Sequence, residues 1–377
     1  MPNNLEPIVY DCAIIGGGLA GLCLSIQLAK ADKKVILFEK NSYPFHKVCG
    51  EYISMESWNF LEKLGLPLSQ MNLPKINKLR VSALNGYMIE SKLDLGGFGI
   101  SRYSLDHELS KLALNYGVNI LQGTNVTGVD EVDNFAILKS TLGQYHARIV
   151  CGSYGKLTPS FISDPNPKSK GMYIAVKYHI KSTLEIDVIE LHNFKDGYCG
   201  VSKIDGDNYC LCYITTTKNL NESGNDIKEM ERSILYKNPI LKKYFTESEF
   251  IFQKPLAISK IALNKKFTHQ QNIFMLGDAA GAIAPLCGNG MSMAIRASKL
   301  LSENLVLYFD NKISKERLTK NYEQQWNKNF SLRIQIAFFL QKLFGKKYST
   351  LFVLKILRVF PKLFTRVISL THGSEIV

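Results

Sequence analysis

The hydrophobic and polar pattern at the start of the chain predicts a strand, a helix and a second strand. Ile8–Ile15 is a short apolar run, which is typical of a buried strand. Leu19–Ala31 repeats its apolar residues at helical spacing, and Lys34–Phe38 is a second apolar run that ends at Glu39. This order, with a glycine-rich turn before the helix, predicts a βαβ unit.

Further along the chain, the pattern predicts more strands and helices of the same layer. Arg102–Tyr116 has helical spacing, and Asn272–Leu276 is another apolar run typical of a buried strand, with helices expected after it. Between these segments, short apolar runs predict strands at Val118–Leu121, Val126–Val132, Ala136–Ser140 and Tyr145–Cys151. Segments that are far apart in the sequence are therefore expected to build one α/β layer.

The middle of the chain has a different pattern, in which short runs rich in β-branched and aromatic residues are separated by Gly, Asp and Asn. Such runs are typical of an antiparallel sheet. Leu79–Leu95 is expected to add strands to this sheet, and Asn225–Tyr236 is expected to be helical. The runs themselves are Met172–Ile180, Asp187–Phe194, Gly197–Ile204 and Tyr209–Thr216.

Three glycines shape the turn between the first strand and the first helix. Gly16, Gly18 and Gly21 form a G-x-G-x-x-G pattern. The first permits a tight turn, the second lets a pyrophosphate approach the backbone, and the third lets helix and strand pack closely. Glu39 stands where a carboxylate accepts hydrogen bonds from an adenosine ribose and repels a 2′-phosphate. The pattern predicts a dinucleotide site that does not hold NADP; the alternative is an ordinary βα turn.

A second glycine-rich turn, in "LGDAAGAIAPLCGNGMSMA", can hold the other half of a long dinucleotide such as FAD. Asp278 follows a buried strand, so its carboxylate can accept hydrogen bonds from ribityl hydroxyls. Pro285 sets a bend, and Gly288-Asn289-Gly290 can bring bare backbone against a flat ring. The helix from about Met291 directs its N-terminus at that ring, which stabilises negative charge by about 0.3–2 kcal/mol. The alternative is a glycine-rich helix cap.

Three segments, "DCAIIGGGLAGL…ILFEK", "GISRYSLDHEL" and "FMLGDAAGAIAPLCGNGMSMA", resemble the flavoproteins that include aromatic hydroxylases of the para-hydroxybenzoate hydroxylase fold. Within them, "KVCGEYIS" at Lys47–Ser54 is similar to the geranylgeranyl-reductase-like branch. The resemblance covers about Val9–Glu303. It implies an α/β fold: a Rossmann-like FAD-binding domain of the glutathione-reductase type, an inserted antiparallel β-sheet substrate domain and C-terminal helices.

The resemblance also implies which residues contact FAD. Arg102 has an alternative interpretation, a cation at a helix start on a surface loop. The implied contacts are Gly16, Gly18, Leu19, Ala20 and Gly21, then Glu39, Lys40, Arg102 and Val126, and finally Asp278, Pro285, Gly288, Asn289, Gly290 and Met291. We expect the FAD-binding domain to comprise residues 1–78, 101–168 and 261–310, the substrate domain residues 79–100 and 169–260, and the C-terminal helical region residues 311–377.

A few side chains are candidates for chemistry beyond cofactor binding. Cys49 lies in the turn that the resemblance brings to the flavin, where it is a candidate catalytic residue; the alternative is a small thiol that merely fits. Tyr198 and Tyr213 are candidate substrate contacts because an aromatic ring can stack on an apolar ligand, or they belong to the core. No metal-binding spacing is present, so no metal is predicted.

This chain departs from the family's pattern at two places. The family usually carries Asp-Gly in the stretch that matches "VCGSYGKLTPS", and its acid is implicated in placing FAD and NAD(P)H; here the pair is Tyr154-Gly155. The Tyr-x-Trp-x-Phe-Pro pattern of the prenyl-reductase branch and the Trp-x-Trp-x-Ile-Pro signature of flavin halogenases are also missing, since the only tryptophans are Trp58 and Trp326. We expect NAD(P)H, if it is the electron donor, to reduce the flavin slowly.

Composition and charge bear on partners and location. The net charge is +13, but no pattern typical of nucleic-acid binding accompanies it, so no nucleic-acid partner is predicted. The eight cysteines form no CxxC pair, no signal peptide or membrane span is expected, and the chain is predicted to be cytoplasmic. The basic excess gathers in residues 329–377, which either lie on an anionic membrane surface or pack as helices with their basic side outward.

These observations lead to one principal hypothesis and two alternatives. The principal one is an FAD-dependent oxidoreductase of the monooxygenase type that acts on an apolar or aromatic small molecule of specialised metabolism. The first alternative is reduction of carbon–carbon double bonds in an isoprenoid lipid. The second is a flavin-binding protein without redox turnover, to which Tyr154 points.

Overall fold

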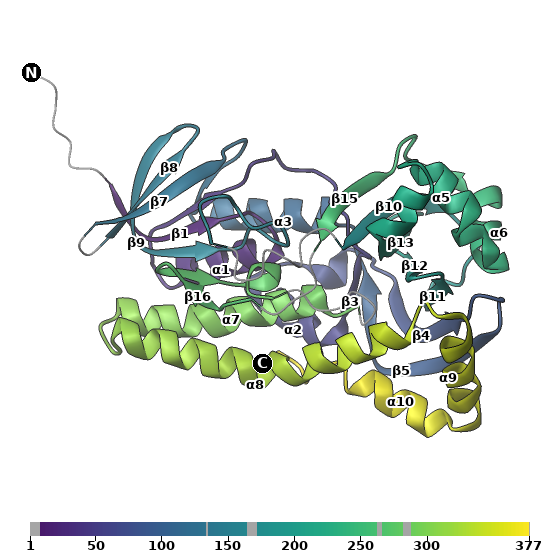
Figure 1. Cartoon of the computed structure of the whole chain (residues 1–377). Coiled ribbons are helices and arrows are strands. Elements are labelled where there is room, and N and C mark those ends of the chain that lie inside the picture. The colour runs from purple at the N-terminus through teal and green to yellow at the C-terminus, as the bar shows by residue number, and fades with distance from the viewer. Residues whose placement is uncertain (1–7, 133–134, 164–171, 262–265, 282–287, 377) are drawn as a thin grey trace, which may run out of the picture.

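Two sheets lie side by side in the computed structural model, which describes residues 8–132, 135–163, 172–261, 266–281 and 288–376 (Figure 1). The first sheet has the order β16-β17-β9-β1-β2-β6, with β7 and β8 joined to it through β9. Its strands are β1 (Val9–Ile15), β2 (Val35–Phe38), β6 (Asn119–Leu121), β7 (Val126–Val132), β8 (Phe135–Ser140), β9 (Gly143–Gly152), β16 (His269–Gln270) and β17 (Ile273–Met275).

The strands of the first sheet that surround β1 are parallel, as the βαβ pattern predicts. β1 pairs with β2 on one side and with β9 on the other, and β17 adds to β9. Helices α1 (Leu19–Lys30), α3 (Arg102–Asn115) and α7 (Gly290–Phe309) pack together beside this sheet (Figure 1). The carboxyl ends of β1, β2 and β17 therefore meet at one edge, where the glycine turns lie.

The second sheet has the order β14-β10-β13-β12-β11-β4-β5-β3, with β15 on β10. It corrects one expectation: the sheet is antiparallel except for β4 and β11, which pair in parallel. Helices α4 (Thr217–Glu222), α5 (Ile227–Ser233) and α6 (Pro239–Glu247) pack near its end. The strands are β3 (Tyr52–Ser54), β4 (Lys75–Ser82), β5 (Met88–Gly99), β10 (Tyr173–Lys181), β11 (Val188–Phe194), β12 (Gly197–Lys203), β13 (Tyr209–Thr216), β14 (Glu249–Phe250) and β15 (Leu256–Ile261).

The expected boundary of the substrate domain at residue 79 falls inside β4, and β3 also belongs to the second sheet. Helix α2 (Trp58–Leu64) follows β3 and contacts α1 instead. We propose to move this boundary so that β3 and all of β4 belong to the substrate domain. The rest of the division stays a proposal.

The C-terminal segment is helical, as predicted, and crosses both sheets (Figure 1). It comprises α8 (Lys315–Leu343), α9 (Lys347–Val359) and α10 (Pro361–Ser369). Helix α8 packs along α7, and its Tyr322 hydroxyl donates to the Met275 carbonyl at 2.8 Å. Helices α9 and α10 pack on β5, with Pro361 at the predicted break. Within the described residues, no helix is long and apolar enough to cross a membrane.

Candidate functional site

The first glycine turn has the geometry that a dinucleotide needs. Gly16 has a φ of +105°, and a Cβ atom built there would lie 2.5 Å from the Ser153 carbonyl oxygen. A Cβ on Gly21 would lie 2.3 Å from the Gly16 carbonyl oxygen, so helix α1 and strand β1 meet closely. A Cβ on Gly18 would meet no protein atom within 3.6 Å, because it would enter a cavity. The turn thus leaves open space at Gly18 alone of these three.

Two cations border that open space. A Cβ on Gly18 would lie 3.7 Å from Lys47 Nζ and 3.8 Å from an Arg102 guanidinium nitrogen. Asp106 holds both cations, at 3.1 Å from Lys47 and 2.7 Å from Arg102. Burial alone would raise the pKa of Asp106, but the charges of Arg102 and Lys47 outweigh it and lower that pKa. The cations are fixed before any phosphate binds, which suits an anionic group beside Gly18.

Glu39 lies at the carboxyl end of β2, beside the same cavity, and is buried. The Gly17 backbone N–H donates to its Oε2 at 3.0 Å, and the backbone and side-chain amides of Asn41 both donate to Oε1 at 3.0 Å. A carboxylate oxygen accepts two hydrogen bonds, so Oε2 keeps capacity for a ribose hydroxyl. The side chain therefore supports the glycine turn as well as facing the cavity.

Substituting Glu39 with alanine is expected to weaken FAD binding by about 1.5–3 kcal/mol, the range for hydrogen bonds to a charged group. Isothermal titration of the apoprotein with FAD measures the change. Asp11→Ala is the matched control, because Asp11 accepts a hydrogen bond from the Lys34 backbone and pairs with Arg148 in the same layer. Equal FAD affinity in the Glu39 variant and the natural protein would show that the ribose is held elsewhere.

One continuous cavity of about 1130 Å³ joins the two glycine turns and extends under the C-terminal helices. Most of the residues predicted to contact the cofactor line this cavity, although they come from three distant parts of the sequence. Gly21 is buried behind the turn, and Pro285 lies outside the described residues. The predicted contacts that border the cavity are Gly16, Gly18, Leu19, Ala20, Glu39, Lys40, Arg102, Val126, Asp278, Gly288, Gly290 and Met291.

The described residues of the second glycine turn border the same cavity. Asp278 stands after β17, as predicted, and its carboxylate pairs with Lys156 Nζ at 3.0 Å, which raises the pKa of that lysine. Helix α7 begins at Gly290, so its N-terminus meets the cavity. The side-chain amide of Asn289 is buried and donates to the Thr371 carbonyl, which is compatible with the predicted approach of bare backbone to the ring. The turn offers backbone rather than that amide to a flat ring.

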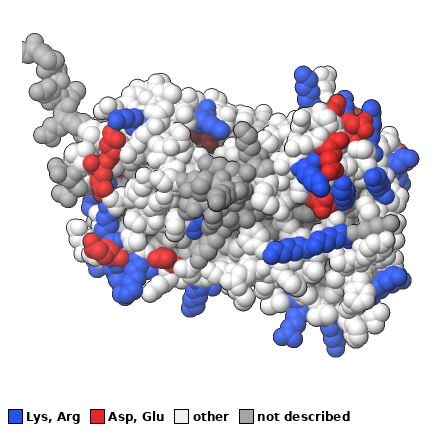
Figure 2. Space-filling view, in the orientation of Figure 1, with Lys and Arg blue, Asp and Glu red and all other residues white. Residues whose placement is uncertain are grey.

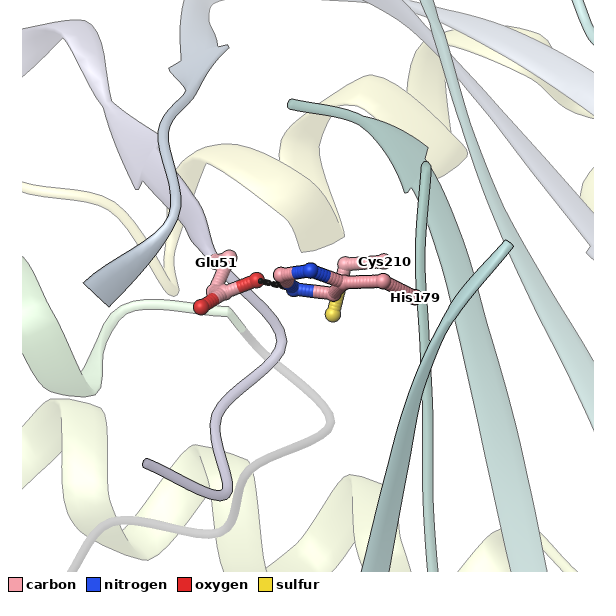
Figure 3. Close-up of side chains that lie close together, drawn as sticks. All are labelled: Glu51, His179 and Cys210. Atoms are coloured by element: carbon pink, nitrogen blue, oxygen red, sulfur yellow. Dashed lines mark hydrogen bonds and ion pairs between the residues drawn. The ribbon is translucent and has the colours of Figure 1, made fainter. Parts of the chain in front are cut away.

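Cys49 borders the cavity at this same place, with its Sγ 3.6 Å from Met291 Sδ. Buried side chains of the second sheet contact the turn that carries it, and Figure 3 shows two of them, His179 and Cys210, beside Glu51 of the turn. Lys177 forms an ion pair with Glu51 Oε1, and His179 Nε2 lies 2.7 Å from Glu51 Oε2. The Cys210 thiol donates to the Cys49 carbonyl at 3.3 Å. The network fixes the backbone of the turn against the second sheet.

Glu51, His179 and Cys210 lie close enough together to hold a metal ion (Figure 3). However, the Lys177 ammonium and the Arg102 backbone N–H already occupy Glu51 Oε1. Burial would raise the pKa of Glu51, but the His179 hydrogen bond and the Lys177 charge outweigh it, so the pKa is lowered. We therefore interpret the group as an ion network that supports the Cys49 turn rather than as a metal centre.

The far part of the cavity has mostly apolar walls. Tyr198 on β12 faces it and packs near Leu340 and Phe344 of the C-terminal segment. Tyr213 also borders the cavity, while its ring belongs to a buried core cluster and its hydroxyl donates to Glu231 at 2.7 Å. The predicted substrate contacts of both tyrosines stay predictions.

Sequence reasoning missed several residues of this site. Lys47 is a charged residue in a turn, and only the Gly18 geometry shows that it borders the open space, with Asp106 of α3 as its buried ion-pair partner. Lys177 is a lysine at an inward position of the strand run Met172–Ile180, with no exposed surface at all. A charge within such an apolar run is a signal that could have been used, because a buried lysine requires an acid beside it.

Comparison with known proteins agrees with this geometry. Residues 14–48 match the family model described as an NAD(P)-binding Rossmann-like domain. The chain is 23% identical to conditioned medium factor receptor 1 of Dictyostelium discoideum, over 89% of this chain and 71% of that protein. It is 24% identical to digeranylgeranylglycerophospholipid reductase of Methanococcus vannielii, over 84% of this chain and 82% of that protein.

Solved structures share the fold of this chain. The flavin-dependent brominase Bmp2 superposes with a TM-score of 0.77 at 17% identity, over 97% of this chain and 93% of that chain. PqsL of Pseudomonas aeruginosa, a probable FAD-dependent monooxygenase, gives a TM-score of 0.72 at 16% identity, over 92% of this chain and 100% of that chain.

The chain has the fold of FAD-dependent monooxygenases and halogenases. This confirms the predicted fold class and the resemblance to hydroxylase-like flavoproteins, and the reductase relative supports the geranylgeranyl-reductase-like branch at low identity. The likenesses also support FAD as the cofactor and an FAD-dependent enzyme. The contacts of individual residues with FAD stay predictions.

Proposed function

We propose that this chain is an FAD-dependent oxidoreductase of the monooxygenase type that acts on an apolar or aromatic small molecule. The observation that carries the proposal is the single cavity, which is polar and glycine-lined at one end and apolar at the other. The polar end suits a dinucleotide, and the apolar end suits a substrate that is poor in hydrogen-bonding groups. FAD, when bound, supplies the redox chemistry.

The chain's own residues would bind FAD, orient the substrate and shield both from water. The turn at Gly16–Gly21 and the cations Lys47 and Arg102 would hold the pyrophosphate, while Glu39 and Asp278 would hold ribose and ribityl hydroxyls. The N-terminus of α7 would stabilise negative charge on a reduced ring. The apolar walls around Tyr198 would offer few hydrogen-bonding partners to water at the reacting end of the cavity. The Cys49 thiol lies at the junction of the two ends, where it could donate a proton to substrate.

The shape of the apolar end favours a second candidate function, reduction of carbon–carbon double bonds in an isoprenoid-like lipid. The walls of this end come from the second sheet and from α8, α9 and α10, and the cavity as a whole has a volume of about 1130 Å³. An elongated hydrocarbon fits such walls better than a single aromatic ring does. The relative from Methanococcus vannielii is named as a reductase of a lipid of that kind.

Flavin reduction without oxygen, followed by admission of air, tests the proposal. The purified protein should be yellow, release FAD on denaturation and bleach with a reductant. Oxygen-dependent conversion of an apolar substrate supports the monooxygenase, whereas conversion without oxygen supports the reductase. A protein that binds FAD but converts no such substrate under either condition would be the redox-silent flavin protein, and a colourless protein that takes up no FAD would end all three proposals.

The place of Tyr154 leads to a prediction about the electron donor. Its side chain borders the cavity, and its hydroxyl lies 3.3 Å from Met275 Sδ. A Cβ on Gly16 would lie 2.9 Å from the Tyr154 Cα atom, so the residue stands beside the first glycine turn. Tyrosine is neutral near pH 7, with an unperturbed pKa of about 10. We expect slow bleaching by free NADPH or NADH because the family's carboxylate is missing.

Tyr154→Asp is expected to speed reduction roughly tenfold, which corresponds to about 1.4 kcal/mol in the barrier. Stopped-flow absorbance of the flavin measures the rate, and Tyr154→Phe is the control that removes the hydroxyl without adding a charge. Fast reduction of the natural protein by either nucleotide, without substrate, would contradict this account of Tyr154.

A further inference from the structure

Helices α9 and α10 and the residue between them carry large apolar side chains that are exposed to water. Phe352 is 65% exposed, Val359 71% and Phe360 59%, and Leu363 is 44% exposed. Soluble proteins leave single apolar residues exposed, but a group of this kind marks a surface that meets something else. We name these four residues the apolar rim.

Basic residues accompany the apolar rim. Residues 347–369 contain Lys347, Lys355, Arg358, Lys362 and Arg366 and no Asp or Glu. Figure 2 shows Lys and Arg without Asp or Glu over α9 and α10, at the lower right of the view. Lys355, Lys362 and Arg366 are exposed on the same helices as the rim. A positive surface around an apolar centre suits the headgroup region of an anionic bilayer.

The cavity reaches this surface. Leu363 of the apolar rim borders the cavity and is also exposed, and so is Phe339 of α8, which is 63% exposed. Ile356, one turn along α9 between Phe352 and Val359, lines the same cavity. The apolar end of the cavity is thus continuous with the rim, so a molecule that leaves the rim need not cross water to enter.

We propose that the apolar rim and its basic residues dock on an anionic lipid bilayer, and that the apolar substrate enters the cavity from that bilayer. The second half rests on the proposed function, and the first does not. A second copy of this chain is the competing occupant. It fits less well, because two copies of the rim facing each other would also bring together two sets of cations without acids.

Cosedimentation with vesicles tests the docking without any turnover. The natural protein should bind vesicles that contain phosphatidylglycerol much more tightly than vesicles of phosphatidylcholine alone. Binding should weaken as salt rises, because screening shortens to about 8 Å at physiological ionic strength. Since this readout does not involve the flavin, it can fail while FAD binding and flavin reduction succeed. Absence of binding to the anionic vesicles at low salt would overturn the proposal.

Variants separate the two parts of the surface. Phe352→Ser with Phe360→Ser should weaken vesicle binding by more than about tenfold. Loss of the transfer free energy of a single large apolar side chain already corresponds to about that factor. Leu142→Ser is the matched control, because Leu142 is 63% exposed in a distant turn. Lys355→Glu with Lys362→Glu should weaken binding by at least about 30-fold at low salt, because each lost lysine costs about 1 kcal/mol. Lys218→Glu with Lys243→Glu is its control, at side-chain exposures of 73% and 72%.

Each variant is checked for FAD content and thermal unfolding, so that only folded proteins are compared. Controls that lose vesicle binding as much as the rim variants would refute a specific surface. Analytical ultracentrifugation tests whether a second copy of the chain covers the apolar rim. The proposal would be overturned if the natural protein is a dimer that binds no vesicles and the Phe352 and Phe360 substitutions convert it to a monomer. That result would assign the apolar rim to a second copy.

Discussion

Gly18→Val is expected to weaken FAD binding by about 100-fold while the protein remains folded. The Cβ atom of residue 18 would point into the cavity between Lys47 and Arg102 and would meet no protein atom closer than 3.7 Å. The backbone φ at Gly18 is −80°, which valine adopts readily. The new side chain therefore occupies the space expected for the pyrophosphate, and overpacking of that kind costs about 1–3 kcal/mol. Fluorescence titration of the apoprotein with FAD measures the loss.

Gly21→Val is the comparison variant, which separates a loss of FAD affinity from a loss of stability. A Cβ there would lie 2.3 Å from the Gly16 carbonyl oxygen, so the substitution strains the fold itself. Thermal unfolding should separate the two variants: Gly18→Val loses about 1 kcal/mol or less at its helix N-cap, whereas Gly21→Val loses more. Full FAD affinity in Gly18→Val would show that no phosphate approaches this turn.

Lys177→Met is expected to lower the free energy of unfolding by about 3–5 kcal/mol, because it leaves the buried Glu51 carboxylate without its cation. Lys177 and Glu51 have no exposed side-chain surface, so water cannot replace the lost partner. The ion pair holds the Glu51 carboxylate, and Lys177 also donates to the Lys47 carbonyl at 3.2 Å. Chemical denaturation measures the loss, and FAD affinity should fall with it because the turn of Cys49 loosens.

Lys181→Met is the matched control, since Lys181 lies on the same strand and is exposed. It should change the free energy of unfolding by less than about 0.5 kcal/mol. Adding Glu51→Gln to Lys177→Met should restore part of the stability, because an uncharged amide costs less to bury than an unpaired carboxylate. A Lys177→Met protein as stable as the control would show that the network contributes nothing to the fold.

The order of elements could be predicted from the sequence because it depends on local patterns. The run at residues 8–15, the glycines after it and Glu39 gave β1, α1 and β2 to within a residue or two, and the four β-rich runs became β10 to β13. The central turn of the site could be predicted for the same reason. A glycine pattern between a strand and a helix can be recognised with its flanking elements, because all three are adjacent in the sequence.

Pairings between distant segments could not be predicted in this way. Glu51 meets Lys177 and His179 across 126 and 128 residues, and only the register of the second sheet brings them together. The parallel pairing of β4 with β11 could not be predicted, because the alternation of apolar and polar residues within a strand does not indicate which strand it pairs with or in which direction. The hydrogen bond from the Asn289 amide to the Thr371 carbonyl could not be predicted for a related reason, because the two residues are 82 positions apart in the sequence.

The C-terminal segment has a consequence for the order of events in the cell. The Arg296 guanidinium donates to the Ser374 carbonyl, and the Ile376 backbone N–H donates to the Glu56 carbonyl at 2.8 Å. Residues 374–376 are thus held against α7 and the residues before α2, and α8, α9 and α10, which follow both glycine turns in the sequence, complete the apolar walls. Both glycine turns leave the ribosome while that end is still open, so a nascent chain can take up its cofactor before synthesis closes the chamber around it.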